Sequence, residues 1–421
     1  MLDIKLIRKD PELVKRNCAA RNVRINLDLM LSLDTQRREL DAKIQELRAA
    51  SKKIAAEKSA DFINEGRRLR AEISEGEQKL AALVKSFDEI YHTLPNLTHP
   101  TTPIGVDESA SRTIAYGVND KPTFGFTPKD HLDIATTLGV VDMAAGTKVA
   151  GPGFYFLNGD AALLELALQN YAINKLVSNG FRFQITPDIA KNDILLGTGY
   201  VPRGNETNTY TLEDTDLSLI ATAEIPLCGQ FTDTVVDVSS PIKICGLSHC
   251  FRTERAAGKA TRGLYRVHQF TKVEMVVLCD PEASEDMHLE LLKIEKEIFD
   301  ELGLPYRVLD IASGDLGASA YKKYDIEAWM PGRNGGEFGE VTSTSNCTDF
   351  QARRMNIRHV SKNGQREFVH TLNGTAIAIS RAMVAIIENF QTSDGRVMFP
   401  QAIAKLLGIK GLDPLVVKAT P

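Results

Sequence analysis

The segment HCFRTERAAGKATRGLYRVHQFTKVEMV, residues 249–276, decides how the sequence is interpreted. Apolar and polar residues alternate in PIKICGLSHCF (241–251) and VHQFTKVEMVV (267–277), which predicts two paired antiparallel strands. Their connection is basic and contains Arg252, Glu254, Arg255, Lys259, Arg262 and Arg266. Guanidinium groups suit bidentate binding of phosphate, so the loop predicts a polyanion site, although a solvated basic hairpin loop would have the same composition.

Two spacings in this hairpin place different chemistries on one face. Arg252 and Glu254 lie two residues apart in a strand-like run, and Phe270 and Glu274 share a face by their even spacing. An arginine there can bind phosphate while a glutamate accepts a hydrogen bond from an amine. A cation, a carboxylate and an aromatic ring together suit a purine nucleotide.

The segments FRTE (251–254) and TRGLYRVHQFTKVEM (261–275) resemble motif 2 of class II aminoacyl-tRNA synthetases, and specifically that of the bacterial-type seryl-tRNA synthetase family. The match is long and its parts follow the family's order, so it is more specific than a short pattern. The family often has Glu-Ala-Gly after the arginine, whereas this chain has Glu-Arg-Ala-Ala-Gly at 254–258. The departure concerns the tip of the loop.

Composition sets broad limits on the class of protein. The chain has 421 residues, of which 43% are apolar and 25% charged, which suits a large globular domain with a smaller one. A net charge of −5 does not indicate a nucleic-acid binder, so such a function would depend on local patches. We expect a cytoplasmic protein with no membrane contact, because no apolar run is long enough to span a bilayer and the N-terminus lacks targeting features.

The six cysteines form no CxxC pair, which predicts free thiols in a reducing compartment. Cys245, His249 and Cys250 invite a zinc interpretation, but they lie within one predicted strand and lack the spacing of tetrahedral ligands. We therefore expect no zinc.

The N-terminal part predicts a helical arm. Residues 1–25 are expected to form a short helix opened by Asp10-Pro11. Residues 33–94 then carry a coiled-coil pattern, with a break at 59–66 and an end at Leu94-Pro95. The seam residues are Leu33, Leu40, Ile44, Leu47, Ile54, Leu69, Ile73, Leu80, Leu83, Phe87, Ile90 and Leu94. We predict an antiparallel hairpin whose arms have about 30 residues and span roughly 45 Å.

Basic side chains gather in the distal half of this arm. They are Arg48, Lys52, Lys53, Lys58, Arg67, Arg68 and Arg70, against the acidic Glu57, Asp61 and Glu65. Such charges also solvate ordinary coiled coils, and the seam is interrupted by Arg37, Ser51 and Gly76. The resemblance implies that the arm binds the long variable arm of tRNA(Ser) mainly through backbone and shape. It also implies an N-terminal tRNA-binding domain over 1–102 and a catalytic domain over 103–421.

The next segment, ALLELALQNYAINKLV (162–177), is apolar nearly all round and predicts a buried helix, followed by Gly180 and the strand FRFQITP (181–187). An ordinary core helix has the same pattern. The position of this unit and its terminal Pro187 resemble motif 1 of class II synthetases, which forms their dimer interface. The resemblance therefore implies a homodimer.

An isolated carboxylate stands in LSLIATAEIPLC (217–228), which we interpret as an apolar strand. Buried there, Glu224 needs a partner, and an amino-acid ammonium, a structural arginine or solvent would each serve. By resemblance, Glu224 accepts the serine amine and Glu274 contacts the serine hydroxyl. The implied serine-binding residues are Thr222, Ala223, Glu224, Glu274, Asn373 and Thr375.

Residues 282–302 predict an amphipathic helix without assigned chemistry, and two strand-like runs follow in YDIEAWMPG (324–332) and EFGEVTSTSNCTDFQARR (337–354). Glu340 and Ser343 are hard oxygen donors of the kind Mg²⁺ prefers, although a Ser/Thr-rich strand end is also common for structural reasons. The family has Glu-x-x-Ser at this place, so the resemblance implies that these two residues bind Mg²⁺.

The segment FVHTLNGTAIAISRAMVAIIENFQ (368–391) predicts a strand, a tight turn at Asn373-Gly374 and then a helix with one buried face. Arg381 interrupts that helix. Such an arginine usually pairs with an internal carboxylate, but its position matches the motif 3 arginine of the family. The resemblance then implies that adenine lies between Phe270 and Arg381.

The resemblance covers nearly the whole chain and predicts an α+β fold, in which an antiparallel-sheet catalytic domain of class II carries an N-terminal antiparallel helical coiled-coil arm. It implies ATP-dependent activation of L-serine and transfer to tRNA(Ser), with tRNA(Sec) left open. Arg252, Glu340 and Arg381 would be catalytic. The implied ATP-binding residues are Arg252, Thr253, Glu254, Arg266, Val267, Phe270, Glu340, Val341, Thr342, Ser343 and Arg381.

Two alternatives have other functions. A relative that loads a carrier protein would typically lack the arm. A non-catalytic RNA-binding paralogue would be expected to lose Arg252, Glu254, Glu274 or Arg381, and all four are present.

Overall fold

The computed structural model describes residues 1–57, 62–200, 208–254 and 263–413. The chain divides into two compact units, Met1–Pro95 and Asn96–Pro421, which are described separately here; the sequence places the domain boundary at 102/103. Several basic residues of the predicted phosphate loop and two charged residues of the arm lie outside the described part: Arg255, Lys259, Arg262, Lys58 and Asp61.

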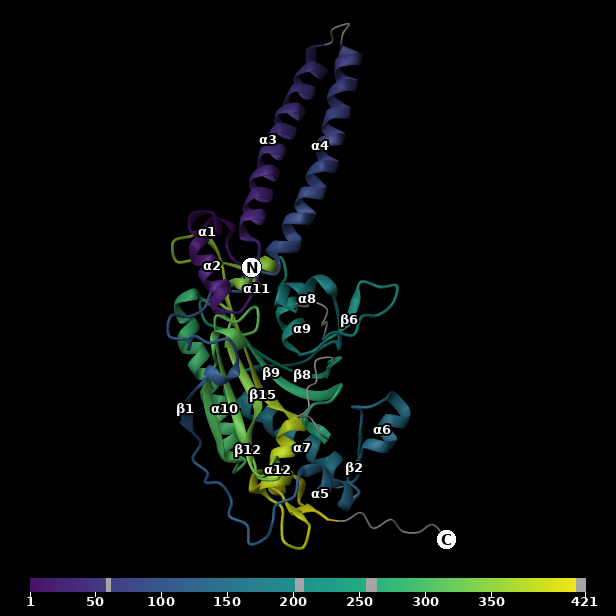
Figure 1. The fold of residues 1–421 in the computed structure, drawn as a ribbon, viewed down its shortest axis with the longest axis vertical. Helices are drawn as coiled ribbons and strands as arrows, with labels where there is room; N and C mark the ends of the chain where they lie inside the picture. The colour runs from purple at the N-terminus through teal and green to yellow at the C-terminus, as the bar shows by residue number, and fades with distance from the viewer. Residues whose placement is uncertain (58–61, 201–207, 255–262, 414–421) are drawn as a thin grey trace. The chain divides into compact units, whose positions relative to one another are not determined.

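The smaller unit is built on a hairpin of two long helices, α3 (Leu27–Glu57) and α4 (Phe62–Tyr91) (Figure 1). Their antiparallel pairing follows from two contacts: the Arg37 guanidinium lies 4.4 Å from the Phe87 ring centre, and Arg48 donates to Glu77 at 2.7 Å. A Cβ on Gly76 would lie 3.0 Å from Ile44 Cγ1, so glycine at this seam position allows the helices to approach closely. The predicted hairpin is confirmed, but α4 begins at Phe62, inside the break expected at 59–66.

Two short helices, α1 (Ile4–Lys9) and α2 (Pro11–Ala20), precede the hairpin, where the sequence predicts a single helix. Asp10 separates them because its carboxylate caps α2 by accepting from the Leu13 amide at 2.9 Å, and proline in the first turn has no N–H to continue α1.

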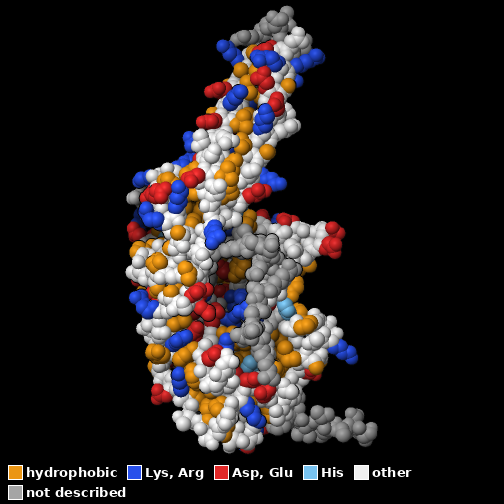
Figure 2. Space-filling model, in the orientation of Figure 1, with side chains coloured by type: hydrophobic (Ala, Val, Ile, Leu, Met, Phe, Trp, Pro, Cys, Tyr) orange, Lys and Arg blue, Asp and Glu red, His pale blue; other side chains and the backbone are white. Residues whose placement is uncertain are grey.

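Charged side chains of both signs are interspersed along the hairpin, with apolar side chains between them (Figure 2). The buried Asp34 accepts hydrogen bonds from Arg8 at 2.7 Å and from Arg37 at 2.6 Å. The charge of Arg37 at the seam is therefore compensated within the unit.

The larger unit is organised around an eight-stranded sheet in the order β1-β10-β11-β12-β15-β9-β8-β4. All neighbouring strands are antiparallel except β4 and β8, which are parallel. The strands are β1 (Arg112–Tyr116), β4 (Arg182–Ile185), β8 (Ile242–Phe251), β9 (Gln269–Cys279), β10 (Tyr306–Asp310), β11 (Lys322–Met330), β12 (Glu337–Asn346) and β15 (His370–Ala378). The predicted central hairpin is confirmed as β8 and β9, which pair Cys250 with Phe270 and Gly246 with Glu274.

Three long helices pack against this sheet and share one apolar core with it (Figure 1): α7 (Asp160–Ser178), α10 (Ser284–Glu301) and α12 (Ile379–Asn389). The shorter helices are α5 (His131–Leu138), α6 (Met143–Ala150), α8 (Asn192–Thr198), α9 (Glu224–Gly229), α11 (Phe350–Met355) and α13 (Gln401–Leu407). Short strands complete the unit: β2 (Val141–Asp142), β3 (Phe156–Leu157), β5 (Ile189–Lys191), β6 (Leu217–Leu219), β7 (Val235–Val236), β13 (Arg358–Val360), β14 (Arg366–Phe368), β16 (Val397–Met398) and β17 (Gly411–Leu412). The α+β antiparallel-sheet prediction is confirmed.

The turn predicted at Asn373-Gly374 is wrong, because β15 runs through both residues without interruption. Gly374 pairs with Met275 of β9 on one side and with Thr344 of β12 on the other. Hydrogen bonding to strands on both sides satisfies the backbone groups and overrides the local turn preference.

The apolar run 217–228 is not one strand. It forms β6 up to Leu219 and then the helix α9, which begins at Glu224. Pro226 lies in the first turn of that helix, where a missing N–H costs nothing.

The helix α7 is only partly buried in a single copy of the chain, contrary to the prediction from its composition. Leu164, Leu168 and Leu176 are buried. Leu163, Leu166 and Val177 are 45%, 59% and 51% exposed, and Ile185 on the edge strand β4 is 82% exposed. An apolar surface therefore faces outward here. No helix in the described ranges has the length and apolar character needed to cross a membrane.

Candidate active site

A cavity of about 60 Å³ lies among β9, β12, β15, the start of α12 and residues from 252–254 and 265–267. It is lined by Arg252, Glu254, Tyr265, Arg266, Val267, Phe270, Glu340, Val341, Thr342, Ser343, Thr375, Ala378, Ser380 and Arg381. The structure thus brings together the predicted ATP-binding residues with the exception of Thr253. The Thr253 hydroxyl instead approaches Asn208 Oδ1 at 3.4 Å.

Arg252 and Glu254 reach this cavity by a different geometry from the one predicted. Strand β8 ends at Phe251, and Glu254 has a left-handed backbone with φ of 46°. This strained conformation is held because the Glu254 amide donates to Asn208 Oδ1 at 2.8 Å, and the Glu254 carboxylate lies 3.4 Å from Arg266. The Arg252 guanidinium lies 5.1 Å from the centre of the Phe270 ring.

Glu340 and Arg381 form an ion pair at the other end of the cavity. Arg381 Nη1 lies 3.0 Å from Glu340 Oε2 and donates to the Glu340 carbonyl at 3.2 Å. Burial tends to raise the pKa of Glu340, but the positive charges of Arg381 and Lys323 outweigh it and lower that pKa to about 2. Glu340 is therefore ionised at neutral pH.

Tyr265 is a site residue that the sequence interpretation missed. Its hydroxyl donates to the Glu340 carbonyl at 3.0 Å, and the Arg381 guanidinium lies 5.0 Å from its ring centre. The available signal was an aromatic residue directly before Arg266 in the basic loop.

The residues around Glu340 fit a hard divalent cation. The Glu340 carboxylate and the Ser343 hydroxyl line the same cavity. Asp325 of β11 stands opposite Ser343 in the strand register, and its buried Oδ1 has no hydrogen-bond partner within the described ranges. Its other oxygen accepts from Lys323 at 2.8 Å. Oxygen donors of this kind match Mg²⁺.

Glu224 is a buried carboxylate at the start of α9, only 6% exposed. Its Oε1 accepts from Gln351 Nε2 at 2.6 Å and from Asn373 Nδ2 at 2.8 Å, and its amide approaches Thr222 Oγ1 at 3.2 Å. Burial, and after it the charge of Glu274, raises the pKa of Glu224 to about 7. Sequence reasoning missed Gln351, which carries no local signal in the short, partly basic segment FQARRM of α11.

Glu274 and Thr375 face each other across β9 and β15. Thr375 Oγ1 donates to Glu274 Oε2 at 3.1 Å, and Lys272 forms an ion pair with the same carboxylate. All three side chains are buried. The predicted serine-binding residues therefore gather in one region, except that Ala223 is fully buried in a neighbouring core cluster.

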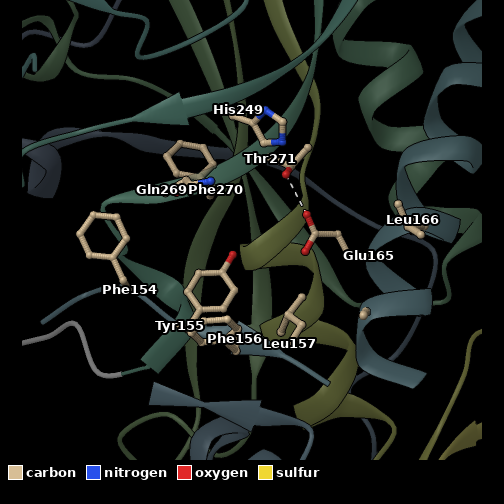
Figure 3. Close-up of a pocket in the computed structure, with 11 residues that line it drawn as sticks. Phe154, Tyr155, Phe156, Leu157, Glu165, Leu166, His249, Gln269, Phe270 and Thr271 are labelled. Atoms are coloured by element: carbon tan, nitrogen blue, oxygen red, sulfur yellow. Dashed lines mark hydrogen bonds between the residues drawn. The ribbon is translucent and has the colours of Figure 1, made fainter. Parts of the chain in front are cut away.

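A larger cavity, of about 400 Å³, lies beside α7 (Figure 3). Phe154, Tyr155 and Phe156 line one part of it. Glu165 of α7 points to Thr271 and accepts a hydrogen bond from its hydroxyl at 2.7 Å. Of the predicted site residues only Phe270 lines it. Its size therefore does not mark the active site.

Comparisons with known proteins agree with this geometry. Residues 210–390 match the family described as tRNA synthetase class II core domain (G, H, P, S and T), so sheet and site define a class II aminoacyl-tRNA synthetase. Residues 1–98 match the seryl-tRNA synthetase N-terminal domain. The serine–tRNA ligase of Rubrobacter xylanophilus is 49% identical over 98% of this chain and 99% of its own, and that of Treponema denticola is 47% identical over 97% and 99%. The chain belongs to the seryl-tRNA synthetase family.

Solved structures show the same relationship. A seryl-tRNA synthetase from Pyrococcus horikoshii, complexed with ATP, is 39% identical with a TM-score of 0.88 and covers 99% of this chain and 100% of its own. A cytoplasmic serine–tRNA ligase from Naegleria fowleri, in complex with AMP, is 33% identical with a TM-score of 0.83 and covers 99% of both chains.

Proposed function

We propose that this protein activates L-serine with ATP to seryl-adenylate and transfers the seryl group to the 3′ end of tRNA(Ser). The observation that carries the proposal is the placement of two separate carboxylate sites, at Glu224 and Glu274, beside a cavity lined by arginines and an aromatic ring. The two carboxylates would accept from the two polar groups that distinguish serine, its ammonium and its hydroxyl.

The pocket then selects serine by hydrogen bonding. Alanine lacks the hydroxyl and would leave the buried Glu274 without its partner, and sites of this type reject such analogues by about 10⁴-fold or more. Threonine keeps the hydroxyl, so its exclusion is steric and depends on the fit around its extra methyl group.

In the activation step, a serine carboxylate oxygen attacks the α-phosphorus of ATP, and the bond from that phosphorus to the bridging oxygen breaks, releasing pyrophosphate. The carboxylate is already ionised, so the step needs no general base. Arg252 would bind the reacting carboxylate and α-phosphate, Arg381 the γ-phosphate, and Phe270 would stack on adenine.

Glu340 and Ser343 would hold Mg²⁺, with Asp325 behind them. When bound, this ion supplies positive charge that orients and neutralises the phosphate oxygens. The ion pair between Arg381 and Glu340 keeps both side chains charged and in place for ATP.

In the transfer step, a hydroxyl of the 3′-terminal adenosine attacks the carbonyl carbon of seryl-adenylate, and AMP leaves. We assign binding of the tRNA to the N-terminal domain (residues 1–102) through the basic distal half of α3 and α4, and catalysis to residues 103–421. Phosphate contacts by these side chains would make tRNA binding sensitive to salt. Whether tRNA(Sec) is also charged depends on the same contacts.

We further propose that the protein is a homodimer, in which a second copy covers the outward apolar face of α7 and β4. Leu163 and Leu166 belong to this face, as does Ile185. The six cysteines are free and buried, which fits the reducing cytoplasm as its location.

The test of this function is charging of purified tRNA with labelled serine, together with ATP–pyrophosphate exchange. We expect serine-dependent exchange and labelled tRNA(Ser), and loss of both in Arg252→Ala. Exchange without tRNA charging would contradict the proposal and favour a relative that loads another acceptor.

A further inference from the structure

Lys272 contacts two of the proposed serine-binding residues, Glu274 and Thr375, although neither the motifs nor the mechanism above gives it a role. It stands on β9 between Phe270 and Glu274 and, by strand periodicity, on the same face. Only 6% of the residue is exposed. Its ammonium pairs with the Glu274 carboxylate and donates to Thr375 Oγ1 at 3.2 Å, while Thr375 donates to Glu274 at 3.1 Å. The three side chains form a closed triangle.

Two other carboxylates lie close enough to Glu274 to interact with it electrostatically. Glu224 approaches from α9, and burial followed by the charge of Glu274 raises its pKa to about 7. Glu295 approaches from α10, and burial followed by the charge of Glu274 raises its pKa well above the usual range. The ammonium of Lys272 opposes the rise at both.

Apart from Lys272, the charge of Lys323 also opposes the rise in the pKa of Glu295, but no hydrogen bond within the described residues does. Glu295 is fully buried, and neither of its carboxylate oxygens has a hydrogen-bond partner in the described part of the chain. A Cβ on Gly374 would lie 2.8 Å from Glu295 Oε1, so this carboxyl group lies directly against the strand that carries Asn373 and Thr375. A buried region containing three carboxyl groups favours protonation of one or more of them unless a cation is present.

We propose that Lys272 is a positioning residue for amino-acid selection, which holds the Glu274 carboxylate in a fixed orientation through the ion pair and the shared Thr375 hydroxyl, and so presents it to the amino acid as a hydrogen-bond acceptor. The inference rests on the proposed role of Glu274 as the serine-hydroxyl contact. An ionised carboxylate requires a donor, which serine has and alanine lacks.

The experiment is a double-mutant cycle on Lys272 and Glu274, measured by ATP–pyrophosphate exchange with serine and with alanine. We expect Lys272→Met to raise the KM for serine about 10- to 100-fold, the effect of losing one charge-assisted hydrogen bond. The KM for ATP should change by less than about twofold, and the serine-to-alanine ratio of kcat/KM should narrow. In the Glu274→Gln background, Lys272→Met should add less than about twofold to the KM for serine, because the two residues act as one unit.

Two further variants separate positioning from folding. Lys272→Gln retains a hydrogen-bond donor without the charge, and the double variant Lys272→Met/Glu274→Gln removes both charges of the ion pair together. The KM for serine can therefore be measured in these two variants even if Lys272→Met is unstable. The matched control is Lys243→Met, which removes a lysine on the neighbouring strand β8 that pairs with Glu290 at 2.6 Å. This control should leave the KM for serine unchanged.

The outcomes distinguish this inference from the proposed function. If Glu274→Gln narrows the serine-to-alanine ratio while Lys272→Met and Lys272→Gln do not, the role of Lys272 is wrong and that of Glu274 stands. If the two substitutions raise the KM for serine additively in the double variant, or if the KM values for ATP and serine rise equally, the effect is a general structural one and the inference is overturned. If no Glu274 variant changes the ratio, both roles fail. Absence of serine-dependent exchange in the unmodified protein would instead refute the proposed function.

Discussion

Serine use by this protein should depend on the ionisation of Glu224. Burial raises the pKa of that carboxyl group to about 7, so it is mostly ionised above this pH and mostly protonated below it. Only the ionised form can accept from the serine ammonium without losing charge complementarity. One pH unit below the pKa leaves roughly one-tenth of the sites ionised, so kcat/KM for serine should fall about tenfold per unit below pH 7 and level off above it.

The midpoint pH of this fall in kcat/KM should depend on the residues that contact Glu224. Gln351 donates to its Oε1 at 2.6 Å and so stabilises the ionised form. Gln351→Leu removes this donor and should shift the step to higher pH. Glu224→Gln cannot ionise, so it should have low activity and no step in this range. The other titratable or charged groups that interact with Glu224 are Tyr200, Cys228, Lys272 and Glu274.

The measurement is ATP–pyrophosphate exchange between about pH 5.5 and about pH 8.5 at constant ionic strength, with serine and ATP varied separately. The kcat/KM for ATP should not show the step, since the pKa of Glu340 is lowered to about 2. Glu290→Gln, which alters a carboxylate on the outer part of α10, is the matched control and should keep the unmodified profile. A flat serine profile, or the same midpoint in Glu224→Gln, would show that Glu224 does not hold the ammonium.

Three further outcomes are expected. Light scattering at micromolar concentration should give about twice the 46.3 kDa chain mass, and Leu166→Asp should lower it; a fully active monomer would contradict the dimer. Deleting Lys52 to Gly66 and closing the hairpin should leave exchange nearly intact while charging collapses, and an equal loss of both would argue against a tRNA-binding arm. Glu295→Gln should raise Tm at neutral pH. A carboxyl group whose pKa is raised in the folded state contributes its full stability below its ordinary pKa of 4.5, and this stability is lost as the pH rises through the folded-state pKa. The gain in Tm from Glu295→Gln should therefore vanish near pH 4.5, and an unchanged Tm at pH 7 would refute the burial argument.

The sequence was most informative where a local period coincides with the tertiary environment. The alternation in 241–251 and 267–277 correctly predicted the β8–β9 hairpin, and the heptad pattern correctly predicted the helical hairpin of α3 and α4. Prediction failed where distant contacts override local preference. The Asn373-Gly374 pair is a turn signal by itself, but β15 is paired on both sides and the strand continues.

Parts of the candidate site also depend on contacts that no local pattern contains. Gln351 reaches Glu224 across 127 positions of the chain, and its side chain is further fixed by Thr371 at 2.7 Å. Lys272 follows the same alternation as any other strand residue, so its hydrogen bond to Thr375, which closes the triangle with Glu274, is visible only when β9 and β15 are seen together. The motifs predicted many of the residues that line the candidate site, and the structure added the hydrogen bonds and ion pairs that position them.

The register of β15 gives amino-acid selection an unusual vulnerability. Asn373 and Thr375 face the pocket because Gly374, between them, pairs with Met275 and Thr344. A slip of one position would turn both side chains to the opposite face, since alternate strand residues point to opposite sides. The amine-side and hydroxyl-side contacts would disappear in one step, while Arg252 and Phe270 on other elements would keep their places. Insertions or deletions in this strand should therefore abolish amino-acid recognition as a whole rather than weaken one contact.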